Sequence, residues 1–391
     1  MKRLSIISLV LVLAIAFTGC TSEELKLYNA FEKSQDITSM ESSTDISFTI
    51  EAEGLSQEDQ QAFEMVKNSI NNSKFNVNQK VTQNKDQTIA KGQIDLGFDI
   101  GGVKSDMQIW VDSDVSGDKP KLVEVIKMPS MLMSSFGPEN ADKQYIVYDV
   151  EKLLSQGETP VDFSKMMNLS KDMGPKLNEF LKNYVKNFDP GFKLVESKGN
   201  STVNGKDLSM YQVKLDDASF KKLVRSSVNY SLDNKETIEF VKEYINLVSS
   251  AMEVTDPENV LAQEEIDKEL KTLQENLPKF KAEFNKFMDN FDKVKVIGDK
   301  GIVIDYGINK DGYIVYEAGS IDLSINIAEI EKAFASDENN EAPTAGIVKL
   351  GVNYKTNIKS INEKLNIEIP QTNEQNSISI EKLMELDTIE E

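Results

Sequence analysis

The feature that most constrains the fold is a long series of short segments that alternate polar and apolar residues and are separated by tight-turn sequences. Ile46, Phe48 and Ile50, for example, recur at every second position, as in a strand with one buried face. Gly101-Gly102 and Asn204-Gly205 separate such segments, and these residues favour hairpin turns because they tolerate positive φ. About a dozen strands joined by hairpins predict one large antiparallel sheet, and a sheet of that size must curl.

Helical periodicity replaces this alternation between about residues 216 and 292, and shorter helical patterns occur at 23–35 and 57–70. We therefore expect an α+β fold in which helices pack over one face of the curved sheet. Residues 364–370, with the sequence KLNIEIP, are expected to form the last strand. The segment QTNEQNS that follows is polar and aperiodic, so residues 371–391 are predicted to form a loosely attached tail with one short helix at most.

A heptad seam marks the end of the helical block. Pro278 interrupts the seam and predicts a kink or a break into two helices. We expect the seam to pack on the sheet or on a matching stripe at 235–254, with Phe280 and Phe284 in the core and Phe287 touching a cavity. The alternatives are a partner helix or a ligand cavity lined by the phenylalanines. The seam has apolar residues spaced alternately by four and three: Ile266, Leu270, Leu273, Leu277, Phe280, Phe284, Phe287 and Phe291.

The N-terminus carries a short export-type signal. Lys2 and Arg3 precede an apolar run from Leu4 to Phe17, which is too short to span a bilayer but suits a secretory signal. Phe17-Thr18-Gly19-Cys20 then resembles the lipobox of bacterial lipoproteins, although Phe17 stands where Leu is usual. That resemblance implies that residues 1–19 are removed and that Cys20 receives a diacylglyceryl group. The alternative is an ordinary secretory signal that happens to contain a cysteine.

A diacylated Cys20 would anchor the chain without a membrane-spanning helix. One acyl chain binds membranes only marginally, whereas two hold stably. We therefore expect the protein at the extracytoplasmic face of the cell membrane, with the bilayer as its first partner. Cys20 is also the only cysteine, so no disulfide can form within the chain and stability must come from a hydrophobic core.

Composition excludes several classes of function. The formal net charge is -21, and removing residues 1–19, with Lys2 and Arg3, makes it -23. Such an acidic surface repels nucleic acid and anionic headgroups, so no nucleic-acid partner is expected. The chain has no histidine, which excludes a Ser-His-Asp triad, a Cys-His dyad and histidine zinc sites.

Two short motifs are weak matches to catalytic and metal sites. Ser219-Phe220-Lys221-Lys222 fits the Ser-x-x-Lys pattern of penicillin-binding enzymes but lacks the accompanying Lys-Thr-Gly element. Residues 112–117 follow the first half of an EF-hand loop, but Val123 replaces the bidentate Glu and Pro120 lies at position 9. We interpret them as a chance match and a polar turn. The sequence therefore predicts no catalytic residue, no metal and no cofactor.

The order of these features is similar to a known family. A lipobox, a short helix, a long antiparallel meander, helices over one face and a final INEKLNIEIP at 361–370 resemble the LolA/LppX-like lipoproteins. Residues 201–224 also resemble the middle of related Gram-positive lipoproteins, many of unknown function. The resemblance implies a half-open β-barrel with helices over the concave side. It then implies one domain at 20–370, with the helical insertion at about 216–292.

Two functions follow as hypotheses. The resemblance implies a carrier of a hydrophobic, lipid-like ligand held between sheet and helices, but it identifies no ligand-contacting residue; Phe280, Phe284 and Phe287 are candidates from the seam alone. The alternative is a cell-surface scaffolding lipoprotein with a filled core, whose protein partner the sequence does not identify. An enzyme using paired carboxylates is a weaker third hypothesis. An apolar cavity of roughly several hundred Å³ under the helices would favour carriage.

Overall fold

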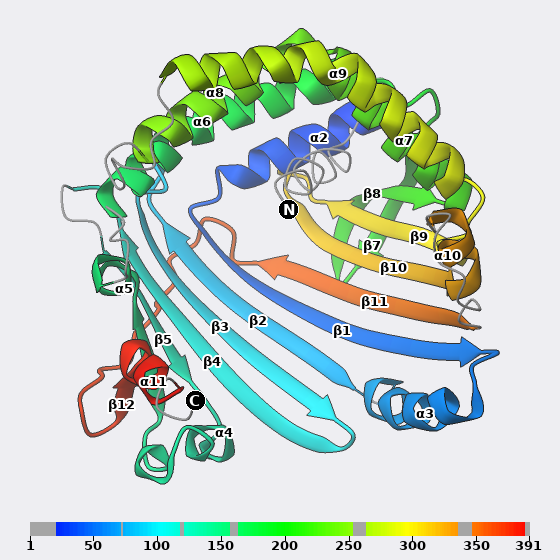
Figure 1. The fold of residues 1–391 in the computed structure, drawn as a ribbon. Helices are drawn as coiled ribbons and strands as arrows, with labels where there is room; N and C mark the ends of the chain where they lie inside the picture. The colour runs from blue at the N-terminus through cyan, green and yellow to red at the C-terminus, as the bar shows by residue number, and fades with distance from the viewer. Residues whose placement is uncertain are drawn as a thin grey trace.

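One curved, twelve-stranded sheet dominates the protein, and helices arch over its concave face (Figure 1). The computed structural model describes residues 21–71, 73–117, 121–156, 163–252, 263–334 and 346–387. The sheet does not close on itself, because β12 and β7 are its two edges in the order β12-β6-β5-β4-β3-β2-β1-β11-β10-β9-β8-β7. The predicted α+β plan, with a half-open antiparallel sheet of about a dozen strands, is confirmed.

Hairpins connect several neighbouring strands, as the turn sequences predict. Asn204 and Gly205 adopt positive φ between β7 and β8, and Gly101 and Gly102 do so between β3 and β4. All neighbours pair antiparallel except β12, which pairs parallel to β6. The strands are β1 (Ser39–Glu53), β2 (Lys74–Gln83), β3 (Ile89–Ile100), β4 (Val103–Asp114), β5 (Lys121–Lys127), β6 (Tyr145–Asp149), β7 (Val195–Val203), β8 (Lys206–Leu215), β9 (Ile297–Ile308), β10 (Ile314–Asn326), β11 (Ile347–Lys359) and β12 (Ser377–Ser379).

Helices α6, α7, α8 and α9 form the arch, and α2 lies beneath it, between the arch and the sheet (Figure 1). A capping box of Thr21 and Glu24 starts α2, which buries Leu27 and Ala30. The α-helices are α2 (Ser22–Gln35), α3 (Gln57–Asn71), α4 (Ser130–Ser134), α5 (Val150–Gln156), α6 (Phe163–Asn187), α7 (Asp217–Asp233), α8 (Lys235–Met252), α9 (Gln263–Phe291), α10 (Ile327–Phe334) and α11 (Ile380–Asp387), with one short 3-10 turn, η1 (Pro138–Asn140).

Helix α6 was not predicted, although the sequence carries a signal for it. Phe180, Tyr184 and Phe188 recur every fourth residue, and all three are buried in the main core. Its buried face packs under α8 and against α2 and α7. The helical cover of the sheet therefore begins well before the predicted block at 216–292.

Helix α9 differs from its prediction in two respects. Of the kink or break predicted at Pro278, the break does not occur, because α9 continues through Pro278 as one helix that follows the curve of the arch (Figure 1). The packing partner also differs from the expected sheet or 235–254 stripe. Helix α9 packs mainly against α7 and also contacts α10, whereas α8 packs mainly on α6. The side chains of Ile266, Leu270 and Leu273 lie outside the described residues.

The C-terminal segment also differs from the prediction. Residues 364–370 form no strand; Ile367 instead packs with Trp110 and Val125 in a small buried cluster. The tail expected to be loosely attached adds β12 to the edge of the sheet beside β6. Its residues Ile378 and Leu383 then complete a second buried cluster with Met133 and Ile146. A three-residue strand is too short to show alternation, so the sequence pattern could not reveal it.

Candidate functional site: the concave face of the sheet

The strand register determines which side chains share the concave face. Ile304 of β9 lies against the core under α2 and α6, so its face is the one that the helices cover. Directly paired residues point to the same face. The paired residues on this face can therefore be followed across the sheet. They are, in order, Ile304, Gly319, Tyr354, Ile46, Phe75 and Phe98.

At the β7–β10 end of the sheet this face is filled. Tyr211 and Val213 of β8, with Tyr306 of β9, are buried against the helices. Phe188, directly after the end of α6, is 1% exposed, and Phe31 of α2 packs edge-on to Tyr306 with ring centroids 5.3 Å apart. This end is an ordinary hydrophobic core.

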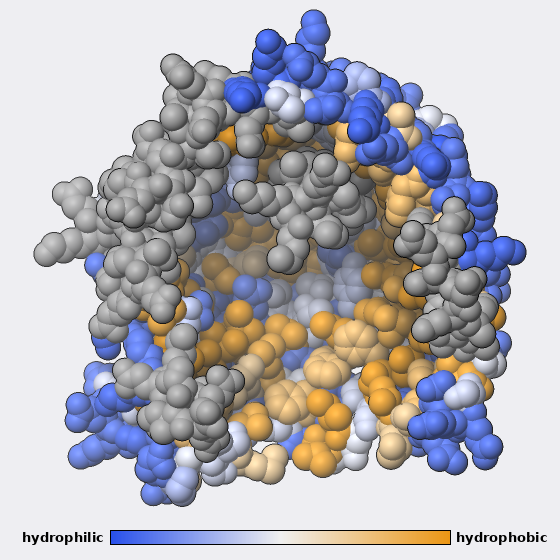
Figure 2. Space-filling view, viewed as in Figure 1, coloured by the Kyte–Doolittle hydropathy of each residue, from blue (hydrophilic) through white to orange (hydrophobic). Residues whose placement is uncertain are grey.

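Toward the middle of the sheet the same face is uncovered. Within the described chain, no hydrophobic side chain of β1, β2, β3 or β11 is buried. Figure 2 looks into the open mouth and shows a hollow lined by hydrophobic residues beneath the helices. The half-buried apolar residues of this face, which we call the concave patch, are Ile46, Phe48, Ile50, Phe75, Val77, Leu96, Phe98, Leu350 and Val352.

A polar group interrupts the patch beside the packed end. The Tyr354 hydroxyl donates to Glu317 Oε1, and the Tyr354 ring lies over Gly319, where any larger side chain would collide with it. Burial and the neighbouring Glu317 carboxylate raise the pKa of Tyr354 above its ordinary value. Thr44 and Thr356 are hydrogen-bonded on the same face at 2.9 Å. This group can hold the polar end of a bound molecule while apolar atoms occupy the patch.

The strands also form a solvent-open hollow of about 580 Å³. Its lining comes from β1, β2, β3, β4 and β11 and includes Ile46, Phe75 and Phe98 of the concave patch together with the alternate polar residues Asp45 and Asn76. Most of the lining residues, Asp45 and Asn76 among them, belong to the alternation that points away from the helices, so the hollow is an open depression mainly on the convex side of the sheet and not a chamber beneath the arch.

The seam phenylalanines of α9 do not form a buried core. Phe280 and Phe284 are half-buried, and Phe287 is 47% exposed and stacks on Phe291 with centroids 5.8 Å apart. The fully buried residue of this turn is Met288, at 0% exposure. The face of α9 that packs on α7 is largely polar, and Asn285 on this face pairs with Asn229 of α7. A search for apolar residues at heptad spacing could therefore not identify this contact face.

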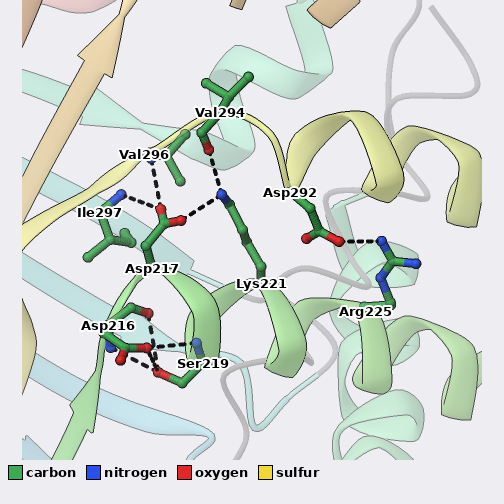
Figure 3. Close-up of polar contacts among 9 residues, drawn as sticks. All are labelled: Asp216, Asp217, Ser219, Lys221, Arg225, Asp292, Val294, Val296 and Ile297. Carbon is green, nitrogen blue, oxygen red and sulfur yellow. Dashed lines mark hydrogen bonds and ion pairs between the residues drawn. The ribbon is translucent and has the colours of Figure 1, made fainter. Parts of the chain in front are cut away.

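A partly buried ion pair ties the arch to the sheet at the start of α7 (Figure 3). Asp217 accepts hydrogen bonds from the backbone N–H of Val296 at 2.8 Å and of Ile297 at 2.9 Å, and Lys221 Nζ lies 2.6 Å from its second oxygen. Burial alone would raise the pKa of Asp217, but the Ile297 N–H, with Lys221 and Val296, holds it below its ordinary value. Lys221 also donates to the Val294 carbonyl and is 4% exposed.

The weak catalytic and calcium motifs have structural partners instead. The Ser219 hydroxyl donates to Asp216 in the capping box of α7, while Lys222 donates to the Gly191 carbonyl. In the EF-hand-like fragment, Asp112 pairs with Lys121 in the neighbouring strand, and Asp114 accepts from Ser116 in the turn. The fragment is the polar end of β4, as interpreted from the sequence.

Two further features concern the membrane. Cys20 lies outside the described residues, which begin at Thr21. In the part of the chain that the structure describes, no helix combines the length and the apolar character needed to cross a bilayer.

Comparison with known proteins gives one kind of match. No protein-family profile matches the sequence, and the comparison with curated proteins gives no match. Among solved structures, the chain is similar to the crystal structure of Mycobacterium tuberculosis lipoprotein LppX, with 10% identity over 88% of this chain and 97% of that chain and a TM-score of 0.26. The superposition is loose, so the assignment of the concave patch depends on this chain's own strand pairing and burial.

Proposed function

We propose that this chain is a membrane-anchored extracytoplasmic lipoprotein, not an enzyme, that binds or carries a lipid-like ligand on the concave patch. The observation that supports this most is the contrast in burial along one sheet face. Apolar side chains that are fully buried at the β7–β10 end give way to half-buried ones in β1, β2, β3 and β11. Covering such a surface contributes about 25 cal/mol per Å² of apolar area removed from water, so a bound acyl chain would be stabilised there.

The anchor part of the proposal is supported by the lipobox-like Phe17-Thr18-Gly19-Cys20. Intact-mass spectrometry of the membrane-extracted protein should find it starting at Cys20 with a diacylglyceryl group. The Cys20→Ala variant should lack that mass and leave the membrane fraction. If Cys20→Ala stays fully membrane-bound, something other than the acyl group holds the protein.

The ligand part is tested by organic extraction of the purified protein and mass spectrometry of the extract. Phe48 lies in the concave patch, and its neighbour Thr49 points to the opposite face and is exposed. Phe48→Asn should reduce copurifying lipid several-fold, while Thr49→Asn, the matched control, should leave it unchanged. Equal lipid in the two variants, or none in the wild type, would contradict carriage and would favour the scaffolding alternative.

A further inference from the structure

Large exposed apolar side chains gather at one edge of the sheet. This edge, which we call the rim, is where β1 and β3 end and β2 and β4 begin. Single exposed apolar residues are normal on a protein surface, but a group of them marks an interaction site. The most exposed members come from three separate connections: Met65 (71%) and Val66 (49%) in α3, Ile100 (43%) and Val103 (63%) in the β3–β4 hairpin, and Met131 (73%) in α4.

The strand register places these three connections at the same edge. Ile100 pairs with Val103 across the hairpin, and Lys74, at the start of β2, pairs with Asp99. Helix α3 joins the end of β1 to that start of β2, and α4 follows the end of β5, which is antiparallel to β4. Figure 1 shows α3, α4 and the β3–β4 hairpin together along the bottom of the view.

The composition of the rim is unusual for connections of this kind. Hairpin tips are normally polar, yet Gly101-Gly102 is flanked by Ile100 and Val103. Helix α3 is amphipathic and lies against β1, where Phe63 and Ile70 are half-buried, but among its described residues none is fully buried, and Met65 and Val66 stay exposed. The rim also adjoins the concave patch, because Phe98 lies two residues before Ile100 on β3.

The chain leaves the signal region at this same edge. Helix α2 begins at Ser22, and Glu24 in its first turn accepts a hydrogen bond from the backbone N–H of Leu194, next to the start of β7. Because the strands from β7 to β1 are antiparallel neighbours, the start of β7 lies at the edge where β1 ends. An acyl group on Cys20, one residue before Thr21, would therefore hold this edge toward the bilayer.

We propose that the rim is a membrane-contacting surface that seats the mouth of the half-barrel on the bilayer. Met65, Val103 and Met131 enter the interface between headgroups and acyl chains, so that a lipid can pass between the bilayer and the concave patch. This inference rests on the proposed function. The net charge, -21 for the full sequence and -23 without residues 1–19, opposes binding to anionic headgroups, so the interaction is apolar insertion and does not need acidic lipid.

The test uses the acylated full chain in phosphatidylcholine vesicles that contain a nitroxide-labelled lipid. A fluorophore is attached through Val103→Cys at the rim or through Ile89→Cys, which is 41% exposed at the opposite edge of the sheet. Acylation blocks Cys20, so each variant carries one reactive thiol. We expect the nitroxide to quench the rim fluorophore at least about fivefold more than the control. Equal quenching at the two positions would overturn the rim proposal.

A second measurement keeps this test independent of the proposed function. Acylation and lipid content are determined on the same samples by mass spectrometry. If the acyl group is absent, Cys20→Ala versions carrying the same labels are tethered to the vesicles through an N-terminal histidine tag and a chelating lipid. If the rim fluorophore of the tethered protein is quenched more than the control, the rim proposal is supported even though the proposed acyl anchor is wrong. Equal quenching at the two positions overturns the rim proposal. Met131→Asp, at a 73% exposed position, should reduce rim quenching without lowering the melting temperature.

Discussion

The two halves of the sheet carry the same alternation of apolar residues but put it to different use. In β8 and β9, Val213 and Tyr306 are sealed beneath α2 and α6. In β1 and β2, the rings of Phe48 and Phe75 contact each other edge-on with centroids 5.6 Å apart and are only half-buried under the arch. Period-two alternation thus identifies a face that avoids water, but the element that covers the face decides whether it becomes core or binding surface.

The comparison predicts different costs for removing a phenylalanine from each half. Phe188→Ala should lower the free energy of unfolding by about 3–5 kcal/mol, because it leaves a cavity in a packed core. Phe48→Ala should cost about 1 kcal/mol or less in lipid-free protein, since its site is already partly open to solvent. Denaturant unfolding of both variants after delipidation measures this. Similar losses would mean that the concave patch is packed in solution.

Added lipid should widen that contrast. A ligand that binds only the folded protein stabilises it by mass action, and a variant with a damaged site gains less. Wild type and Phe188→Ala should therefore gain similar increments in melting temperature, while Phe48→Ala gains a smaller one. A uniform gain in all three proteins would place the ligand elsewhere.

The C-terminal segment, which belongs to neither half of the comparison, provides a further test of how tightly the sheet edge is packed. Leu383 is 7% exposed in the cluster that holds β12 to the sheet edge. Leu383→Ala should cost about 2–4 kcal/mol if that cluster folds with the sheet. The adjacent Lys382→Ala, at an exposed position, is the matched control and should be nearly neutral. A negligible loss for Leu383→Ala would restore the loosely attached tail that the sequence suggested.

Much of the architecture could be read from the sequence because its signals are local. Asn204-Gly205 and Gly101-Gly102 specify hairpins by their tolerance of positive φ, and alternation specifies strands. Long-range information was missing. Residues Ser377–Ser379 form a strand only because β6 lies beside them, and Ile367 is buried only because Trp110 and Val125 lie across from it.

The candidate site was harder to predict for the same reason. Phe280, Phe284 and Phe287 stood out as a seam, but the structure places a larger set of half-buried apolar side chains on the strands at the middle of the sheet. No local pattern distinguishes Phe48 from Val213, because both alternate with polar neighbours. Only the position of α2 and α6 separates them. The contact between α7 and α9 was missed for the opposite reason. It includes the polar pair Asn229 and Asn285, so apolar periodicity did not identify this face of α9 as a packing surface.

Two adjacent residues of α9 test how this helix packs in the arch, with smaller expected changes in stability. Met288 is fully buried and Phe287 is 47% exposed, although both are large and apolar. Met288→Ala should cost about 2–3 kcal/mol, and Phe287→Ala less than about 1 kcal/mol. Thermal unfolding of the two variants distinguishes them. If Phe287→Ala is as costly, the seam packs in solution as the heptad pattern suggested; if it also changes copurifying lipid, it touches the ligand.

A further test concerns the ion pair that joins the arch to the packed half. Asp217→Asn keeps an oxygen for the backbone N–H groups of Val296 and Ile297 but removes the charge facing buried Lys221. It should cost about 2 kcal/mol at pH 7, within the range for hydrogen bonds to charged groups. The loss should appear in denaturant unfolding, and Asp216→Asn, which alters only the exposed cap of α7, should cost less.

The stability difference between wild type and Asp217→Asn should disappear as the pH is lowered. The folded pKa of Asp217 lies below its ordinary value, so its contribution is present above the unfolded pKa of about 3.9 and is lost as pH falls through the folded pKa. Wild type and Asp217→Asn should thus differ from neutral pH down to about pH 4 and converge below it. A difference that persists unchanged at lower pH would show that shape, not charge, joins the arch to the sheet. The arch over the concave patch would then keep its attachment in acid.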